Sequence, residues 1–323
     1  MKKRYILGVA IGLASTGVLA SLAYRKFKAK DNCEQEFDNE IEKELSSDSE
    51  VLKDNIIEES VRKYYDEISD DNKISEQDLL AKIDSNEDCL IVDIRNEDYY
   101  QLNHIKNAVN VVWPYDIANK LYYLPQDKPI YIYCYTGQTS GQTVALLRIL
   151  GFDAYSVNRG MAGLKRLSNI DDYLSDEDRY LTELPGTCLN ITLLKVVTNY
   201  YDELIEVEGS KFTNNKIIEK DAKEMLDNDE DVCWLSIRSE QDYNDAHIKG
   251  AINIPFGKNM DSNFVLLPKD KKIIVYSYTG QTAGQTVATL RILGFDAVSI
   301  NGGLGKEANY PSGWINKGFD LVS

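Results

Sequence analysis

Short apolar runs alternate with amphipathic stretches along most of this chain. Four of the apolar runs have the length of strands, and they cover residues 89–94, 108–112, 129–133 and 154–157. Continuous apolar runs bounded by polar turns are typical of strands that are buried on both faces of a parallel sheet. Apolar residues recur at helical spacing over 139–150, and Ser75 followed by Asp78 predicts the start of another helix. The pattern predicts an α/β architecture in which a mainly parallel sheet is flanked by helices.

The same pattern occurs twice. The stretch Tyr135–Ala154 reappears almost unchanged as Tyr278–Ala297, 143 positions later. Self-similarity over such a length marks the duplication of a structural unit. We therefore predict two copies of one α/β domain, at residues 55–180 and 190–323.

Each copy opens on a predicted amphipathic helix, over residues 56–68 and 192–204. Both helices carry a tyrosine pair, which begins at Tyr64 in the first and at Tyr200 in the second. We expect each tyrosine pair to pack on its own domain. The alternative is that the two helices pair with each other across the two domains.

The first 30 residues predict a membrane segment. Residues 5–24 are uncharged and mostly apolar, and a helix of this length matches the roughly 30 Å thickness of a bilayer's hydrocarbon core. Basic residues flank this run on both sides, which favours a retained anchor over the alternative, a cleaved signal peptide. Residues 31–54 are acidic and predict a solvated tether. We expect a membrane-anchored, extracytoplasmic protein, although the flanking charges leave the orientation open.

Composition narrows the chemistry. The net charge is −16, which is unsuited to nucleic acid because nucleic acid is bound largely by cationic groups. The chain has five cysteines without a CxxC pair and only two histidines, so we predict no metal site and no cofactor. The odd number of cysteines argues against a disulfide framework and predicts at least one free thiol.

Candidate chemistry lies where the third predicted strand runs into the helix. Cys134 follows this strand, and Gly137 lies between the cysteine and the helix. In parallel α/β sheets, ligands bind at the carboxyl ends of the strands. A glycine here allows a positive φ, so that several backbone N–H groups can point at one centre. Those donors, with the helix N-terminus, would stabilise a thiolate at Cys134 and lower its pKa.

The segment Cys134-Tyr-Thr-Gly-Gln-Thr139 resembles the six-residue active loop of rhodaneses, which are thiosulfate or persulfide sulfurtransferases. Their upstream signature, Asp-x-Arg followed by Gly-His-Ile-x-Gly-Ala-x-Asn, is similar to Asp93-Ile-Arg95 and to Asn103-His-Ile-Lys-Asn-Ala-Val-Asn110. Both glycines of that signature are asparagines in copy one. The resemblance covers roughly residues 73–170 and 216–310.

The resemblance implies roles for individual residues. Cys134 would accept sulfane sulfur as a persulfide and pass it to cyanide or to a thiol of a small molecule or a protein. Substrate binding would fall to the loop and to one arginine, which are Tyr135, Thr136, Gly137, Gln138, Thr139 and Arg95. Arg95 has a second interpretation as a residue that orients the scaffold near the loop, and His104 is interpreted as a side chain that stabilises a turn.

Copy two departs from the family pattern at the decisive positions. Ser277 stands where copy one has Cys134, and Ser236 stands where copy one has Asp93. A serine cannot store sulfane sulfur, and no base is evident that would activate it. We predict that copy two is catalytically silent. Two-domain rhodaneses typically keep the cysteine in the second copy, so the order is reversed here.

Two alternatives compete with this interpretation, and the other cysteines need an assignment of their own. A related phosphatase and arsenate reductase loop would need an arginine at position 140, which is Ser140. A non-catalytic interpretation is a sulfur-relay or protein-binding module in which copy two supplies a docking surface. Cys188, in the segment between the copies, could resolve a Cys134 persulfide, whereas Cys89 and Cys233 are predicted to be inert core residues.

Overall fold

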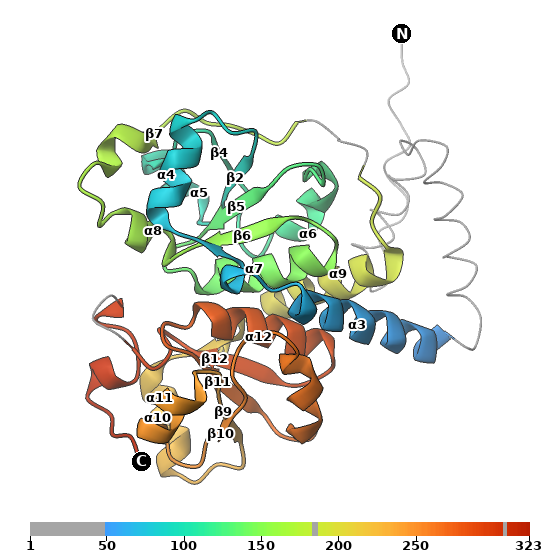
Figure 1. Ribbon diagram of the computed structural model, residues 1–323, viewed down its shortest axis with the longest axis vertical. Coiled ribbons are helices and arrows are strands. Elements are labelled where there is room, and N and C mark those ends of the chain that lie inside the picture. Colours follow the sequence, from blue (N-terminus) through green and yellow to red (C-terminus); the bar gives the residue numbers. More distant parts are fainter. Residues whose placement is uncertain (1–48, 183–186, 306–308) are drawn as a thin grey trace.

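A computed structural model describes residues 49–182, 187–305 and 309–323 of the 323 residues (Figure 1). The predicted membrane segment and nearly all of the predicted tether lie outside these ranges. Within the described ranges, no helix is both long enough and apolar enough to cross a bilayer.

Each copy is built on its own five-stranded, fully parallel sheet. The order in copy one is β1 (Lys73–Ile74), β6 (Ala154–Val157), β5 (Ile130–Tyr133), β2 (Leu90–Asp93) and β4 (Ala108–Asn110). The equivalent order in copy two is β8 (Lys216–Ile217), β12 (Ala297–Ile300), β11 (Ile273–Tyr276), β9 (Cys233–Ser236) and β10 (Ile252–Asn253). The predicted strands and the duplicated α/β fold are confirmed.

Helices cover both faces of each sheet. Copy one contains α3 (Ser49–Asp66), α4 (Glu76–Asp84), α5 (Glu97–Leu102), α6 (Ile117–Lys120), α7 (Gln138–Ile149) and α8 (Gly160–Leu164). Copy two contains α9 (Ile191–Glu206), α10 (Glu219–Asp227), α11 (Glu240–Asp245) and α12 (Gln281–Ile292). The helix predicted from Ser75 is confirmed, because the Ser75 side chain accepts a hydrogen bond from the amide of Asp78 and α4 ends at Asp84.

Short 3₁₀ helices and one small antiparallel pair complete the described part of the fold. The 3₁₀ helices are η1 (Asp70–Asn72), η2 (Leu121–Tyr123), η3 (Ile170–Tyr173), η4 (Thr213–Asn215), η5 (Met260–Leu266) and η7 (Ile315–Lys317). In copy one, β3 (His104–Ile105) pairs with β7 (Leu174–Ser175). In copy two, the equivalent pairing is a single bridge between His247 and Val322.

The two copies meet through α7 and α12, which lie against each other between the two sheets (Figure 1). The contact is reciprocal. Gln138 donates to Ser299 Oγ (2.7 Å) in copy two, and Gln281 donates to Ser156 Oγ (2.7 Å) in copy one. Around these contacts, one apolar cluster is continuous through both copies. The opposite face of each sheet has a separate core.

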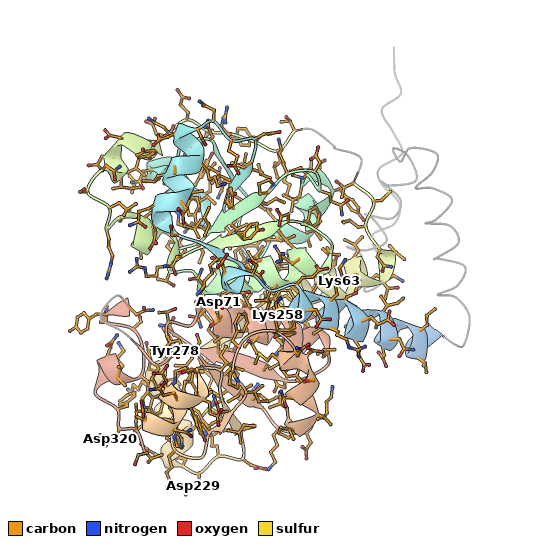
Figure 2. All side chains as sticks on the ribbon, in the orientation of Figure 1. Lys63, Asp71, Asp229, Lys258, Tyr278 and Asp320 are labelled. Atoms are coloured by element: carbon orange, nitrogen blue, oxygen red, sulfur yellow. The ribbon has the colours of Figure 1, made fainter. Side chains whose placement is uncertain are left out.

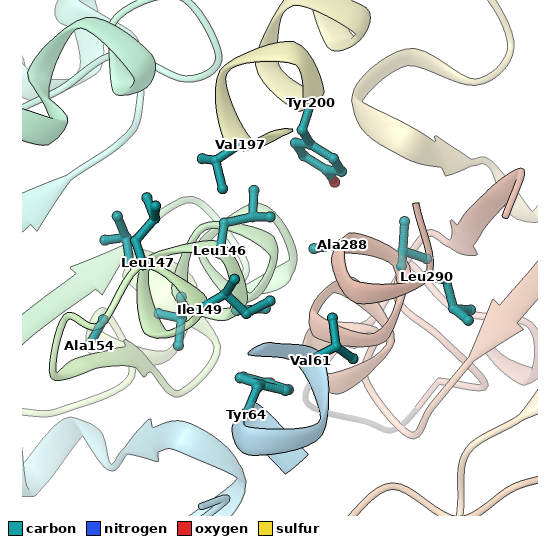
Figure 3. Close-up of a cluster of buried hydrophobic side chains, with 14 of the residues drawn as sticks. Val61, Tyr64, Leu146, Leu147, Ile149, Ala154, Val197, Tyr200, Ala288 and Leu290 are labelled. Atoms are coloured by element: carbon teal, nitrogen blue, oxygen red, sulfur yellow. The ribbon is translucent and has the colours of Figure 1, made fainter. Parts of the chain in front are cut away.

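The helices that open the two copies correct one prediction. Figure 3 shows α3 and α9 flanking the α7/α12 pair, and the two helices also contact each other, as the alternative expected. The Tyr64 hydroxyl donates to Gln285 Oε1 (2.5 Å) and the Tyr65 hydroxyl lies 2.8 Å from Thr289 Oγ1, both in α12. Tyr200 in turn donates to Gln142 in α7. The expectation that each tyrosine pair packs on its own domain was wrong for the hydroxyl groups, because Tyr64, Tyr65 and Tyr200 each hydrogen-bond to the central helix of the other copy.

Candidate functional site

Cys134 lies between the end of β5 and the start of α7, and its side chain is only 2% exposed. The amide of Gly137 donates to its Sγ (3.1 Å), and the amide of Ser140 lies 3.5 Å from the same atom. Gly137 has a φ of +94°, a conformation that a residue with a Cβ adopts only under strain. The predicted backbone cradle is thus present, and it places Sγ at the N-terminus of α7, where the helix dipole favours negative charge.

A chain of hydroxyl groups connects the cysteine to copy two. Ser140 Oγ lies 3.5 Å from Cys134 Sγ and 2.8 Å from Ser156 Oγ. Ser156 Oγ accepts a hydrogen bond from Gln281 Nε2 (2.7 Å), which belongs to α12. The Ser140 hydroxyl also donates to the Gly137 carbonyl (3.1 Å), so its orientation is set by its own loop and, through Ser156, by a residue of the copy that lacks the cysteine.

These groups shift the thiol toward its ionised form. Burial raises the pKa of Cys134, but the Ser140 and Thr139 hydroxyls and the loop amides lower it by more, so the pKa lies below the ordinary thiol value. Hydrogen bonds to a charged form stabilise that form. The thiolate, the nucleophilic form of cysteine, is therefore more accessible here than in an ordinary cysteine.

A pocket of about 200 Å³ opens above Cys134 and is walled by both copies. Copy one contributes Ile94, Asn96, Trp113, Pro114, Tyr115, Cys134, Tyr135, Thr136 and Thr139, and the segment from α9 to β8 contributes Leu204, Glu208, Thr213, Asn214 and Lys216. This size suits a small ligand or the end of a larger one.

The structure distributes the predicted loop residues between two roles. Tyr135, Thr136 and Thr139 line the pocket beside Cys134. Gly137 forms the cradle underneath. Gln138 does not reach the pocket, because its side chain is directed into copy two, where it donates to the carbonyl of Ile300 (3.0 Å) as well as to Ser299.

Arg95, assigned above to substrate binding, lies outside the pocket. Its guanidinium is buried and forms an ion pair with Asp93 (2.6 Å), donates to the carbonyl of Asn103 (2.7 Å) and lies over the ring of Tyr133. With these partners, the guanidinium ties the end of β2 to the loop after α5. This geometry supports the scaffold interpretation of Arg95 and not the substrate-binding one.

The other predicted side chains have structural surroundings. His104 is buried and stacked on Tyr100, and its two ring nitrogens lie 2.8 Å and 3.1 Å from backbone carbonyls. Burial raises the pKa of both Cys89 and Cys233, which are free and half-buried. Cys188 is disulfide-bonded, so it has no thiol with which to resolve a Cys134 persulfide, and that hypothesis is withdrawn.

Copy two keeps the cradle without the thiol. Ser277 Oγ accepts from the amides of Gly280 (3.0 Å) and Ala283 (3.4 Å), as Cys134 does in copy one. Ala283 replaces the hydroxyl-bearing Ser140, however. Arg238 has Ser236 in place of the carboxylate that pairs with Arg95, and its buried Nε has no hydrogen-bond partner among the described residues.

Both copies resemble a known domain family. Residues 75–167 and 219–306, one stretch in each copy, both match the rhodanese-like domain. The chain belongs to the rhodanese-like domain family. In this rhodanese-like protein, the matched stretches contain both cradle loops, the one with Cys134 and the one with Ser277.

Individual relatives are distant. The rhodanese-like chain is 32% identical over 72 residues to thiosulfate sulfurtransferase PspE of Escherichia coli (strain K12), a match that covers 22% of this chain and 69% of that protein. It is 36% identical over 75 residues, or 23% of its length, to the tRNA sulfurtransferase of Desulfurococcus amylolyticus, of which it spans only 14%. Among solved structures, SseA from Escherichia coli, described as a 3-mercaptopyruvate sulfotransferase, is 19% identical with a TM-score of 0.32 and covers 72% of this chain and 99% of its own.

Sequence reasoning missed three residues of the site. Ser140 was considered only as the absence of a phosphatase arginine, although it lies one helical turn beyond the loop glycine and supports the thiol. Lys216 and Asn214 were missed because they belong to the copy that lacks the cysteine. The repeat itself held a signal, since Lys216 aligns with Lys73, but no sequence pattern shows which site such a residue faces.

Proposed function

We propose that this protein is a sulfurtransferase that carries sulfane sulfur as a persulfide on Cys134. The observation that carries the proposal is the Cys134 thiol at the floor of a small pocket, with the Gly137 amide 3.1 Å from Sγ and a pKa lowered by surrounding donors. Membership of the rhodanese-like family supports it, since the matched relatives are named as sulfurtransferases. The donor we propose is thiosulfate or a persulfide, and the acceptor is cyanide or a thiol of a small molecule or a protein.

The proposed reaction has two displacements. In the first, the Cys134 thiolate attacks the sulfane sulfur of thiosulfate, the bond from that sulfur to the sulfonate sulfur breaks, and sulfite leaves with the bonding electron pair. Cys134 then carries a persulfide with one negative charge, which the loop amides can hold in place of the thiolate. In the second, cyanide or an acceptor thiolate attacks the terminal sulfur and the Cys134 thiolate leaves. No redox partner is consumed when the acceptor is cyanide, and thiocyanate is the product.

Copy two takes no part in covalent chemistry under this proposal. Ser277 occupies an intact cradle, but its hydroxyl has no base among its hydrogen-bond partners in the described part of the chain and cannot store sulfane sulfur. We propose that copy two is retained for the contacts that it makes with the Cys134 loop and pocket.

Intact-mass spectrometry tests the proposal. Wild type and Cys134→Ser are incubated with thiosulfate, with inorganic polysulfide or with glutathione persulfide. The expected result is a gain of about 32 Da, one sulfur atom, in wild type alone, and its discharge by cyanide or a thiol. A wild-type protein that gains no sulfur from any of the three donors would refute the proposal and favour a non-catalytic, protein-binding rhodanese-like module.

We also propose that residues 5–24 tether the protein to a membrane with its folded part on the extracytoplasmic side. The support is the uncharged apolar run between two basic flanks. Fractionation with carbonate extraction, followed by protease treatment of intact cells, tests both parts. Release of the protein by carbonate would contradict the tether, and protection from protease would contradict the orientation.

A further inference from the structure

The pocket above Cys134 has an asymmetric distribution of charge. Among the described residues that line it, Lys216 is the one cation and Glu208 the one acid, and both come from copy two. Lys216 is the first residue of β8 and is half-buried. Glu208 accepts a hydrogen bond from the Tyr115 hydroxyl (2.6 Å), a contact exposed to solvent. The positive charge of Lys216 therefore lies in the pocket with the thiol, whereas the Glu208 carboxylate is hydrogen-bonded to Tyr115 of copy one.

The duplicated fold provides an internal comparison for Lys216. Its counterpart Lys73 opens β1 and forms an ion pair with Asp71 (2.9 Å), two residues earlier. The position equivalent to Asp71 is Asn214, and both residues have the same left-handed backbone, with φ of 54° and 61°. Figure 2 shows Asp71 where the two copies meet. The fold thus allows a carboxylate at this place, but in copy two the carboxylate is replaced by a neutral amide.

The consequence is that the two lysines differ in their partners. Lys73 is neutralised by its own turn, whereas Lys216 has no carboxylate within ion-pair distance in the described part of the chain. The pKa of Lys216 lies below its ordinary value, because burial lowers it by more than the nearby Cys134 and Glu219 raise it. A half-buried cation without a carboxylate partner is stabilised when an anion enters the same pocket.

The turn that carries Lys216 is fixed to copy one at two points. The indole N–H of Trp113 donates to Asn214 Oδ1 (3.0 Å), and Gln142 Nε2 donates to the Asn214 carbonyl (3.0 Å). Trp113 also lies against Tyr201 in an edge-to-face contact. These contacts fix the backbone that carries Lys216 before a ligand binds, so little backbone conformational entropy is lost on binding.

From this arrangement, we propose that Lys216 of copy two binds the anionic end of the sulfur donor at Cys134 and makes the site selective for small anionic donors. The inference rests on the proposed function, which it deepens by naming the donor class. In the first displacement, a thiolate meets a dianion such as thiosulfate, so three negative charges come together in one small pocket. The helix dipole of α7 and the loop amides oppose this repulsion from one side, and Lys216 opposes it from the other. Copy two, silent by itself, then completes the site of copy one.

The first test uses two alkylating probes that do not depend on sulfur chemistry. Iodoacetamide is neutral and reports the thiolate fraction of Cys134, whereas iodoacetate is an anion and also reports the attraction of the pocket for negative charge. The rates at Cys134 are measured in the full-length protein by peptide mass spectrometry, because Cys89 and Cys233 are also free. We expect Lys216→Gln to lower the iodoacetate-to-iodoacetamide rate ratio by about tenfold, a change that corresponds to about 1.4 kcal/mol, and to raise the KM for thiosulfate in parallel. Lys216→Arg should keep the wild-type ratio.

The internal comparison supplies matched variants. Asn214→Asp introduces the carboxylate that copy one has, while its remaining oxygens can still accept from Trp113, so it should reproduce the effect of Lys216→Gln without loss of the lysine. Lys73→Gln is the control, since Lys73 is the equivalent residue of the other copy, and it should leave the ratio unchanged. Urea unfolding of each variant verifies that the fold is intact.

The outcomes separate this inference from the proposed function. An unchanged ratio and an unchanged thiosulfate KM in both Lys216→Gln and Asn214→Asp would overturn the role of Lys216, even if wild type still took up sulfur. If instead the ratio falls as expected but wild type gains no sulfur from any donor, the anion site stands and the proposed sulfur transfer fails. A fall in the ratio in Lys73→Gln of the same size would also overturn the inference, because the effect would then not be local to the pocket.

Discussion

Gly284 in α12 lies directly against the backbone carbonyl of Gln138, the first residue of α7, with no room for a Cβ between them. Gly141 in α7 lies against the carbonyl of Gln281 in the same way. The two helices therefore approach each other at their N-terminal ends, which are also the ends that carry the cradle loops. Contact between the copies and geometry of the Cys134 site are thus set by the same residues.

We predict that Gly284→Ala loosens both the interface and the site. The added methyl group meets a backbone oxygen that cannot rotate away, so we expect a loss of about 3 kcal/mol in the free energy of unfolding, the upper end for overpacking. The rate of Cys134 alkylation by iodoacetamide should change as well, because the start of α7 must move. Gly294→Ala is the control, since its Cβ would meet open space and only backbone strain of about 1 to 2 kcal/mol is expected. An alkylation rate altered equally in both variants would contradict the prediction.

A second prediction concerns α3, the first helix of copy one, which packs on both α7 of its own copy and η5 of copy two. Tyr65 is fully buried, and its ring lies edge-to-face against Phe264 (5.6 Å between centroids). We expect Tyr65→Ala to destabilise copy two by about 3 to 5 kcal/mol, the usual range for the loss of a buried aromatic ring. In a Trp113→Phe background, the remaining tryptophans, Trp234 and Trp314, both belong to copy two, so fluorescence in a urea titration reports that copy. An unmoved fluorescence transition would show that α3 stabilises copy one alone.

The third prediction concerns the hydroxyl beneath the thiol. Ser140→Ala removes one donor to the Cys134 thiolate, and a hydrogen bond to a charged group contributes about 1.5 to 3 kcal/mol. We therefore expect the pKa of Cys134 to rise by about one to two units, measured as the pH dependence of iodoacetamide alkylation. Ser239→Ala, which removes an exposed helix cap in copy two, should leave this pKa unchanged. A Ser140→Ala profile that coincides with wild type would show that the loop amides alone stabilise the thiolate.

The lowered pKa also predicts how stability depends on pH. A thiol whose pKa is lower in the folded state stabilises that state fully at pH values above the unfolded pKa, and this contribution is lost as the pH falls through the folded value. Compared with Cys134→Ser, wild type should therefore gain stability as the pH rises from about 6 to about 9, by about 1.4 kcal/mol for each unit by which the pKa is lowered. Urea unfolding of both proteins at the two pH values measures this difference. A constant difference would mean that the pKa of Cys134 is not lowered.

Much of the fold could be predicted because local sequence patterns determine it. Apolar runs marked the strands of copy one, and the repeat transferred them to copy two. The loop from Cys134 to Thr139 was predictable for the same reason, since a strand, a glycine and a helix start in succession define the cradle. The exchange of tyrosines could not be predicted in this way. An amphipathic pattern predicts that one face of the helix is buried. It does not show which copy covers Tyr64 and Tyr65.

The same limit explains the misassigned and missed site residues. Arg95 and Gln138 are polar residues near the cysteine in the sequence, yet Asp93 and Ser299 hold their side chains elsewhere. Lys216 is 82 positions from Cys134 in the sequence and enters the pocket only because the copies pack through α7 and α12. Proximity in sequence predicted the cradle but not the far wall of the pocket.

The two copies differ at few positions around their cradles, so the function of copy one can be dissected in copy two. In a Cys134→Ser background, Ser277→Cys places a thiol in an intact cradle, but Ala283 supplies no hydroxyl and Lys73 is neutralised by Asp71. We expect this thiol to have a higher pKa than Cys134 and to take up sulfur from thiosulfate more slowly, by about tenfold or more for each missing charge-assisted contact. Adding Ala283→Ser should lower the pKa, and adding Asp71→Asn should then lower the KM for thiosulfate, each measured by iodoacetamide alkylation and by sulfur uptake in intact-mass spectrometry. If Ser277→Cys alone matches wild type, the cradle is sufficient and neither Ser140 nor Lys216 contributes, whereas stepwise recovery would assign the pKa to the hydroxyl and the donor affinity to the lysine.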